Sequence, residues 1–259
     1  MCKINHLVSI IVPYFNNQNT LEDTLNSVLH SSYDNIEIIV INDGSEKSPE
    51  YLIDKLNDKR IILHSQSNKG VSAARNFGVA LSQGEYLLFL DADDLVAPGY
   101  IEKGVQILNN NHALKLVCCL TERFDKNKSE KWKLPPLSIE NLTASNCIPV
   151  SNILRKKDFI AVGGFDENLP ALEDWDLWLR LLNSDDDFFQ ISEYLFYYRQ
   201  HDISHTNLSK IYFHNKENHN NLLNKIFEKH PKTEVQMLKQ KIANFNKRPW
   251  YERMIRKIK

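Results

Sequence analysis

The chain has 259 residues, of which 42% are hydrophobic and 25% charged, so it is long enough to bury a sizeable core. Its net charge of −1 gives no signal for binding a polyanion, and we expect no nucleic-acid partner. The four cysteines form no CxxC pair, which argues against a zinc site.

The first 120 residues alternate short apolar runs with segments in which apolar residues recur at helical spacing. We expect strands at residues 7–13, 36–41, 61–64, 86–90 and 114–120, and helices at residues 20–30, 48–56, 70–81 and 100–108. This alternation predicts an α/β fold with a doubly wound, mostly parallel central sheet flanked by helices. Ligands bind to such sheets at the carboxyl ends of the strands.

The second half of the chain has a less regular pattern. Residues 124–147 are charged and then proline-bearing, and we expect a loop or partial lid there. A strand is expected at residues 148–155, a helix at residues 173–182 and a last strand at residues 188–198. The chain then becomes polar and helical in pattern. We therefore divide it into a domain of residues 1–205 and a basic helical C-terminal extension of residues 206–259.

Polar residues follow three of the expected strands, at residues 13–16, 42–45 and 91–94. Because the carboxyl ends of parallel strands meet at one edge of a sheet, these residues describe a binding crevice. Asp91 and Asp93 can jointly hold a hard divalent cation, with a diphosphate supplying further oxygens. The alternative is a helix N-cap followed by acidic residues of the first turn.

Two further residues near this edge have candidate roles. Asp43 can accept the N–H of a pyrimidine base, or it can bond its own backbone in an Asp-Gly turn. Arg75, early in a helix, can pair with a diphosphate or fix one of the aspartates, and the alternative is a solvated surface arginine.

The acidic pair Glu173 and Asp174 opens the helix expected at residues 173–182. An inverting sugar transfer needs a base that deprotonates the acceptor hydroxyl, and this pair can supply it, with Trp175 and Trp178 as an aromatic platform. The alternative is ordinary acidic charge at a helix N-terminus. His201 can ligate the metal from the far side of the site, or it can be a structural histidine.

Taken together, these motifs resemble the family-2 glycosyltransferases of the GT-A fold, over about residues 7–205. The matching segments are Ser9-Ile-Ile-Val-Pro-Tyr-Phe-Asn16, Ile39-Val-Ile-Asn-Asp-Gly-Ser45, Gly70-Val-Ser-Ala-Ala-Arg-Asn-Phe-Gly78, Gly84-Glu-Tyr-Leu-Leu-Phe-Leu-Asp-Ala-Asp-Asp94, Gly163-Gly-Phe-Asp-Glu167, Glu173-Asp-Trp-Asp-Leu-Trp-Leu-Arg-Leu181 and Tyr198-Arg-Gln-His201. Each segment is short, but seven in this order and spacing are highly specific.

The resemblance implies an inverting enzyme that uses Mn²⁺ or Mg²⁺ and a nucleotide-sugar donor, most often a UDP-sugar. Asp174 would be the catalytic base with Glu173 in support, and Asp93 the main metal ligand, joined by Asp91 and His201. The residues implied on the donor side are Pro13, Phe15, Asp43, Asn68, Arg75, Asp91 and Ala92. Those implied on the acceptor side are Trp175 and Gly164.

Three features depart from the family's pattern. Phe15 stands where a tyrosine is usual, which removes a hydroxyl, and Asn42 replaces a common aspartate before Asp43. The QxxRW signature of processive polymer synthases is missing after the helix at residues 173–182, which favours transfer of a single sugar.

We therefore expect a hexosyl- or N-acetylhexosaminyltransferase in surface polysaccharide synthesis, whether capsule, O-antigen or lipooligosaccharide. Its acceptor would be a hydroxyl of a saccharide or lipid-linked saccharide. A sugar nucleotidyltransferase would need a glycine-rich, basic loop after the first strand, and residues 14–18 contain neither glycine nor lysine. A dehydrogenase would need GxGxxG, which is missing. The alternative outside enzymes is a non-catalytic nucleotide- or glycan-binding pseudoenzyme of the same fold.

Two features of the sequence indicate where in the cell the protein acts. We expect a cytoplasmic protein, because residues 1–6 show no signal-peptide core and no stretch approaches the length of a membrane span. Residues 239–259 combine basic side chains with apolar ones at near-helical spacing. This pattern is typical of a helix on the inner face of an anionic membrane. The alternatives are a helix packed on the domain or on a partner subunit, for example in a homodimer.

Overall fold

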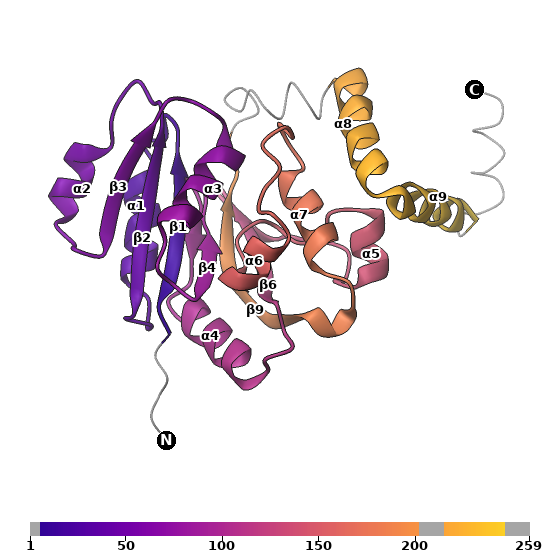
Figure 1. Cartoon of the computed structure of the whole chain (residues 1–259), viewed down its shortest axis with the longest axis horizontal. Helices are drawn as coiled ribbons and strands as arrows, with labels where there is room; N and C mark the ends of the chain where they lie inside the picture. Colours follow the sequence, from indigo (N-terminus) through magenta and orange to yellow (C-terminus); the bar gives the residue numbers. More distant parts are fainter. Residues whose placement is uncertain (1–5, 202–214, 247–259) are drawn as a thin grey trace.

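The structure, a computed structural model, describes residues 6–201 and 215–246. Helices cover both faces of a curved central sheet (Figure 1). In the N-terminal half the elements are β1 (Val8–Tyr14), α1 (Leu21–Leu29), β2 (Ile36–Asp43), α2 (Glu50–Leu56), β3 (Ile61–Gln66), α3 (Val71–Leu81) and β4 (Tyr86–Phe89). The expected alternation of strands and helices is confirmed there.

These first four strands form a parallel sheet in the order β3-β2-β1-β4. Val8 of β1 lies opposite Ile36 of β2 on one side and Tyr86 of β4 on the other. Every residue of β2 is buried, and so is all of β1 except Pro13. Burial on both faces explains why these strands are nearly continuous apolar runs in the sequence.

The second half of the sheet is mixed. Its elements are β5 (Leu95–Val96), α4 (Tyr100–Asn110), β6 (Leu116–Phe124), β7 (Ser129–Lys131), α5 (Ile139–Ala144), β8 (Ile153–Arg155), α6 (Lys156–Ala161), α7 (Glu173–Leu181), the 3₁₀ turn η1 (Asp185–Asp187) and β9 (Phe188–Arg199). Strand β8 runs antiparallel between β4 and β6, whereas β9 runs parallel to β6. The expected loop at residues 124–147 thus contains a short strand and a helix, and the expected strand at residues 148–155 is only three residues long.

Two apolar clusters hold the helices against the two faces of the sheet. Helices α1 and α4 contribute buried side chains to one cluster, and α3, α5, α6 and α7 contribute to the other. Helix α3 approaches the sheet closely, because a Cβ added to Gly78 would lie 2.5 Å from Cγ2 of Ile11. The small residues of this helix in the sequence reflect this close contact.

Helices α8 (Lys216–Lys229) and α9 (Pro231–Asn246) pack beside α7 and α5 (Figure 1). Leu222 and Ile226 of α8 are buried in the same cluster as Trp178 of α7. Within the described ranges, no helix is both long and apolar enough to cross a membrane. Of the basic segment at residues 239–259, the part after residue 246 lies outside the described residues, so its membrane contact stays a prediction.

Candidate active site

The acidic loop after β4 holds three aspartates with three different partners. Oδ1 of Asp91 lies 2.6 Å from Nη2 of Arg75, and Oδ2 of Asp93 lies 2.6 Å from Nε2 of His201. Asp94 is buried and accepts a hydrogen bond from the backbone N–H of Arg199 at 2.8 Å. Because β9 ends beside this loop, the predicted juxtaposition of His201 and Asp93 is present in the structure.

Arg75 joins the acidic loop to helix α7. Its side chain is only 2% exposed, and its second nitrogen, Nη1, lies 2.7 Å from Oε1 of Glu173. Burial opposes the charge of Arg75, but the carboxylates of Asp91 and Glu173 outweigh it and raise the pKa of the guanidinium. Of the roles open from the sequence, the structure shows the one in which Arg75 fixes an aspartate.

Asp174, the expected catalytic base, lies next to Glu173 at the start of α7. Its Oδ2 accepts a hydrogen bond from Nδ2 of Asn146 at 2.9 Å, and its Oδ1 accepts one from the N–H of Trp175 at 2.7 Å. Burial and the neighbouring Glu173 raise the pKa of Asp174 to about 7, although the bond from Asn146 opposes the shift. A carboxylate that titrates near neutral pH suits general-base chemistry.

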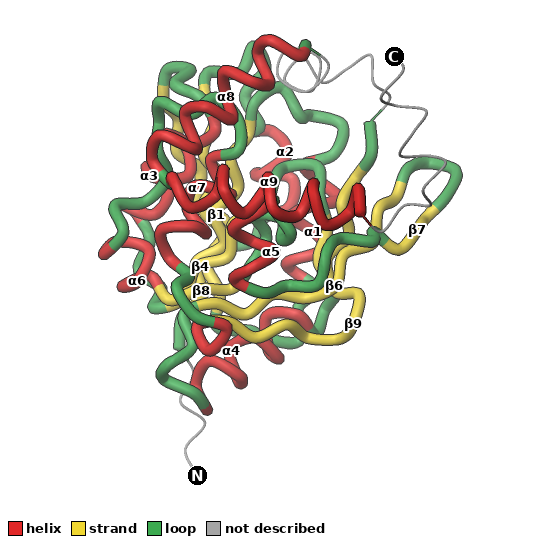
Figure 2. Tube along the Cα trace, turned by 90° about the vertical axis from the view of Figure 1, so that its right-hand side faces the viewer, coloured by secondary structure: helices red, strands yellow, loops and turns green. Residues whose placement is uncertain are grey.

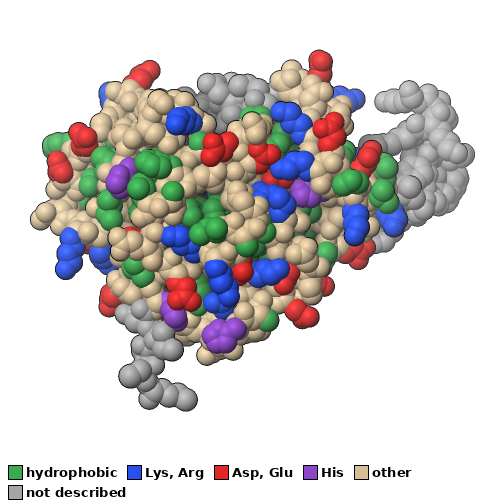
Figure 3. Space-filling view, viewed as in Figure 1, with side chains coloured by type: hydrophobic (Ala, Val, Ile, Leu, Met, Phe, Trp, Pro, Cys, Tyr) green, Lys and Arg blue, Asp and Glu red, His purple; other side chains and the backbone are tan. Residues whose placement is uncertain are grey.

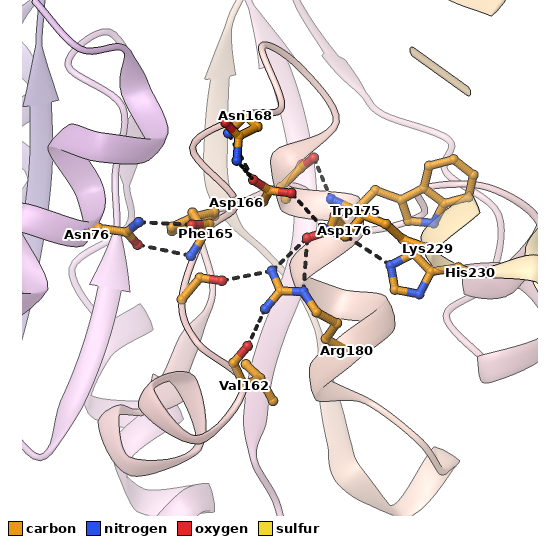
Figure 4. A network of polar contacts seen from close by, with 12 residues as sticks. Asn76, Val162, Phe165, Asp166, Asn168, Trp175, Asp176, Arg180, Lys229 and His230 are labelled. Carbon is orange, nitrogen blue, oxygen red and sulfur yellow. Dashed lines mark hydrogen bonds and ion pairs between the residues drawn. The ribbon is translucent and has the colours of Figure 1, made fainter. Parts of the chain in front are cut away.

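A polar network fixes the other side of α7 (Figure 4). The carboxylate of Asp176 is fully buried and contacts Arg180 at 2.7 Å, Lys229 at 2.6 Å and His230 at 2.9 Å. Burial opposes ionisation of Asp176, but hydrogen bonds from His230, Lys229 and Arg180 outweigh it and hold its pKa well below the usual range. Because Lys229 and His230 lie where α8 meets α9, this network ties the C-terminal helices to the helix that carries Asp174.

The expected nucleotide side lies at the ends of β1 and β2. Phe15 is 47% exposed, and Pro13, two residues before it in β1, is partly buried. Asp43 accepts hydrogen bonds from the N–H groups of Lys69 and Gly70 and from Nε2 of Gln66. Asp43 therefore fixes the loop before α3 rather than its own turn.

Two other donor-side residues lie at the same edge. Asn68 is exposed in the loop before α3, and a Cβ added to Gly44 would lie 2.6 Å from its backbone nitrogen. Ala92 is buried in the acidic loop, and its carbonyl accepts a hydrogen bond from the hydroxyl of Thr20 at 2.8 Å. The three polar strand ends are thus brought together, as the sequence predicted.

The two expected acceptor residues occupy structural positions. Trp175 is only 2% exposed, and its indole Nε1–H donates to the carbonyl of Leu142 at 2.7 Å, so the expectation of an aromatic platform at Trp175 was wrong. Gly164 is buried with φ of +72°, and its carbonyl accepts from Arg180. A side chain there would collide with Asn76, so Gly164 shapes a turn, and its contact with an acceptor stays a prediction.

One residue of the site was missed. Asn146 lies in the segment that the sequence assigned to a loop, just after α5, and nothing in its local pattern indicates a contact with Asp174.

Within the described residues, no group of three or more His, Cys, Asp or Glu side chains has the geometry of a metal centre. On the face seen in Figure 3, cationic and anionic side chains are interspersed.

The fold belongs to a known class. The chain superimposes on S. aureus TarS 1-349 in complex with UDP-GlcNAc with a TM-score of 0.68 and 18% sequence identity, covering 79% of this chain and 61% of that one. A second structure, S. aureus TarS, gives a TM-score of 0.62 at 19% identity, over 74% of this chain and 36% of that one. The fold is therefore that of the GT-A glycosyltransferases.

The family follows from the sequence. The profile of Glycosyl transferase family 2 matches residues 9–163, more than half of the chain, and the chain belongs to this family. It is similar to an uncharacterized glycosyltransferase of Rickettsia typhi, at 35% identity over 78% of this chain and 66% of the relative. It is also similar to one of Rickettsia bellii, at 34% identity over 68% of this chain and 27% of the relative. The chain thus spans about two thirds of the first relative and about a quarter of the second.

Proposed function

We propose that the protein is an inverting glycosyltransferase that moves a single hexosyl or N-acetylhexosaminyl residue from a UDP-sugar to a hydroxyl of a saccharide or lipid-linked saccharide. The observation that carries the proposal is the bridge made by Arg75. Its guanidinium contacts Asp91 at 2.6 Å and Glu173 at 2.7 Å, so the acidic loop and the candidate base belong to one site. The UDP-GlcNAc in the TarS complex supports a uridine nucleotide as the first donor to test.

Asp174 performs the proton transfer in this mechanism. The acceptor oxygen attacks the anomeric carbon as the bond from that carbon to the diphosphate oxygen breaks, and the acceptor proton passes to the carboxylate of Asp174. A single in-line displacement inverts the anomeric configuration. The departing diphosphate keeps the bonding electrons and gains negative charge.

The side chains at the acidic loop offer ligand types suited to a divalent cation, although they are not gathered as a metal centre within the described residues. Asp93 and His201 lie side by side and offer an oxygen and an imidazole nitrogen, which are ligand types that Mn²⁺ accepts, and Asp91 keeps one oxygen away from Arg75. When bound, Mn²⁺ or Mg²⁺ supplies Lewis-acid neutralisation of the diphosphate. Asp93 and His201 would hold the cation, and Asp91 would add its free oxygen.

The remaining donor-side residues would bind the nucleotide. The exposed ring of Phe15, next to Pro13, offers a surface for the base. Asp43, which fixes the loop before α3, would contact the base. Asn68 and Ala92 would contact the nucleotide from that loop and from the acidic loop. Arg75 would act on the donor through Asp91, because both of its terminal nitrogens are engaged.

The wider setting is also proposed. We place the reaction in the synthesis of a surface polysaccharide at the cytoplasmic face of the membrane, with residues 239–259 as the peripheral contact. A homodimer is the alternative use of that segment.

Ligand-dependent thermal stability tests the donor class. The melting temperature is measured with UDP, GDP, TDP, CDP and CMP, each with and without Mn²⁺. We expect UDP with Mn²⁺ at about 100 times its Kd to stabilise the fold by about 2.7 kcal/mol, a rise of roughly 5–10 °C. In Asp93→Ala the Mn²⁺-dependent part of this rise should disappear. If no nucleotide raises the melting temperature, the proposed donor site is wrong.

A further inference from the structure

Three side chains form a stack where β6, β7 and β9 meet. The guanidinium carbon of Arg123 lies 3.8 Å from the ring centre of Trp132, whose ring centre lies 5.3 Å from that of Tyr198. Arg123 lies opposite Tyr198 in the pairing of β6 with β9, and Trp132 directly follows β7. Figure 2 shows β7 at the rim of the molecule beside β6. We call Arg123, Trp132 and Tyr198 the aromatic stack.

The aromatic stack adjoins the acidic loop of the candidate active site. Tyr198 precedes Arg199, whose backbone N–H donates to Asp94 at 2.8 Å and whose Nε–H donates to the carbonyl of Asp93 at 2.7 Å. Partial burial raises the pKa of the Tyr198 phenol, and the nearby carboxylates of Asp94, Asp91 and Asp93 raise it further. The stack therefore lies within electrostatic reach of the site that would hold the diphosphate.

The stack presents surface to solvent. Tyr198 is 38% exposed and Trp132 is partly exposed, whereas Trp175 and Trp178 of α7 are buried in the core. Partly exposed aromatic rings beside a few polar groups are the composition of small-molecule and saccharide sites. The platform that the sequence placed at Trp175 is therefore better supplied by Trp132 and Tyr198.

The charge of Arg123 has no anionic partner in residues 6–201 and 215–246. Glu130 lies opposite Arg123 in the pairing of β6 with β7, but no ion pair joins the two side chains, and the Nε atom of Arg123 is buried without a hydrogen-bond partner. A guanidinium held over an indole ring can still use its terminal N–H groups for bidentate contact with an oxyanion. A fixed cation without an ion pair indicates a negatively charged ligand.

We propose that the aromatic stack is the acceptor subsite and that the acceptor is a saccharide bearing an oxyanion, either a phosphate or a carboxylate. This proposal rests on the proposed function, because it assigns the acceptor to the same site. The rings of Trp132 and Tyr198 contact the sugar, and Arg123 binds its anionic group. The carboxylates of the acidic loop would repel an anionic acceptor, and the positive charge of Arg123 offsets this repulsion.

Saturation-transfer NMR with three related sugars tests this subsite on the full chain with UDP and Mn²⁺ present. The probes are methyl β-glucoside, methyl β-glucuronide and glucose 6-phosphate, which share a pyranose ring and differ in charge. We expect at least one of the two anionic probes to bind about tenfold or more tightly than the neutral one, and the tighter of the two identifies the anion. If no probe binds the unmodified chain, or if the neutral probe binds as tightly as both anionic probes, the proposal is wrong.

Variants assign the effect to the stack. Arg123→Gln should reduce binding of the preferred anionic probe to that of the neutral probe, and Trp132→Ala should weaken all probes about tenfold, whereas Trp132→Phe retains most of the binding. Tyr51→Ala, which removes an 83% exposed tyrosine of α2, is the matched control. If Trp132→Ala or Arg123→Gln binds the probes as the unmodified chain does, the subsite is refuted.

The UDP thermal shift of the same samples separates the two proposals. A normal shift in Trp132→Ala shows that this variant is folded and retains the donor site. If the unmodified chain shows no shift with UDP, the proposed donor site fails, whereas a normal shift without saccharide binding contradicts only the acceptor subsite.

Discussion

The hydrogen bond from Asn146 to Asp174 should set the pH at which the proposed base ionises. Asn146→Ala removes a donor that lies 2.9 Å from Oδ2 of Asp174 and leaves the burial of that carboxylate and its neighbour Glu173 in place. Because the lost bond stabilises only the ionised form, the pKa of Asp174 should rise above its value of about 7.

The size of this shift follows from the strength of the bond. A hydrogen bond to a charged group contributes roughly 1.5–3 kcal/mol, and one pKa unit corresponds to about 1.36 kcal/mol, so the pKa of Asp174 should rise by roughly 1–2 units. At pH 7 the ionised fraction would fall from about one half to between roughly 1% and 10%. Transfer at pH 7 should therefore slow by roughly 5- to 50-fold and recover toward pH 9.

Carbon-13 NMR of labelled aspartate carboxyls measures the pKa without any substrate. The resonance of Asp174 is assigned by its loss in Asp174→Asn, and its titration is compared between the unmodified chain and Asn146→Ala. Asn168→Ala, which removes an exposed asparagine bonded to Asp166, is the control and should leave the titration of Asp174 unchanged. A pKa of Asp174 that is the same in Asn146→Ala and in the unmodified chain would refute the reasoning.

Three stability predictions accompany this one, each measured by urea unfolding. The stability advantage of Asp174→Asn over the unmodified chain should grow by about 2–3 kcal/mol from pH 5 to pH 8. The raised pKa of Asp174 makes its ionisation in the folded state costly, and this cost increases as the pH rises; an advantage that is the same at both pH values would contradict this. Asp176→Asn should lose about 3 kcal/mol, since it leaves cationic partners without their buried carboxylate, and a loss under about 1 kcal/mol would contradict the role of that network. Gly104→Ala should lose about 1–3 kcal/mol, because its Cβ would collide with Cδ1 of Ile153, whereas Gly99→Ala, with its nearest neighbour at 3.8 Å, should change little. Equal losses would show that the contact is unimportant.

The N-terminal half of the fold was predictable because its signals are local. Strands β1 and β2 are buried on both faces, so their apolar runs identify them directly, and the polar residues after them mark the carboxyl edge. The GT-A fold and the family expected from the motifs are both confirmed. The mixed pairing of β8 between β4 and β6 depends on contacts between distant segments, which no local pattern encodes.

The candidate site was predictable in part for the same reason. The contact of His201 with Asp93 and the placement of Arg75 beside Asp91 agree with the motifs, but the sequence left open which partner Arg75 takes. Trp175 was expected at the surface because it follows the acidic pair Glu173 and Asp174, but the fold buries its ring against α5. Asn146 was missed because its role depends on a fold-determined contact across 28 residues.

In the proposed reaction Asp174 accepts the proton of the acceptor hydroxyl. The most direct measurement is the release of UDP from UDP-glucose, UDP-galactose and UDP-GlcNAc by the unmodified chain and by Asp174→Asn, with Mn²⁺ and an anionic saccharide present. We expect one donor to be consumed, and Asp174→Asn to bind UDP normally and release it on the order of 10²-fold more slowly. Comparable rates for the two proteins would remove Asp174 from the chemistry, and no release from any donor with either an anionic or a neutral saccharide present would contradict the proposed transferase activity.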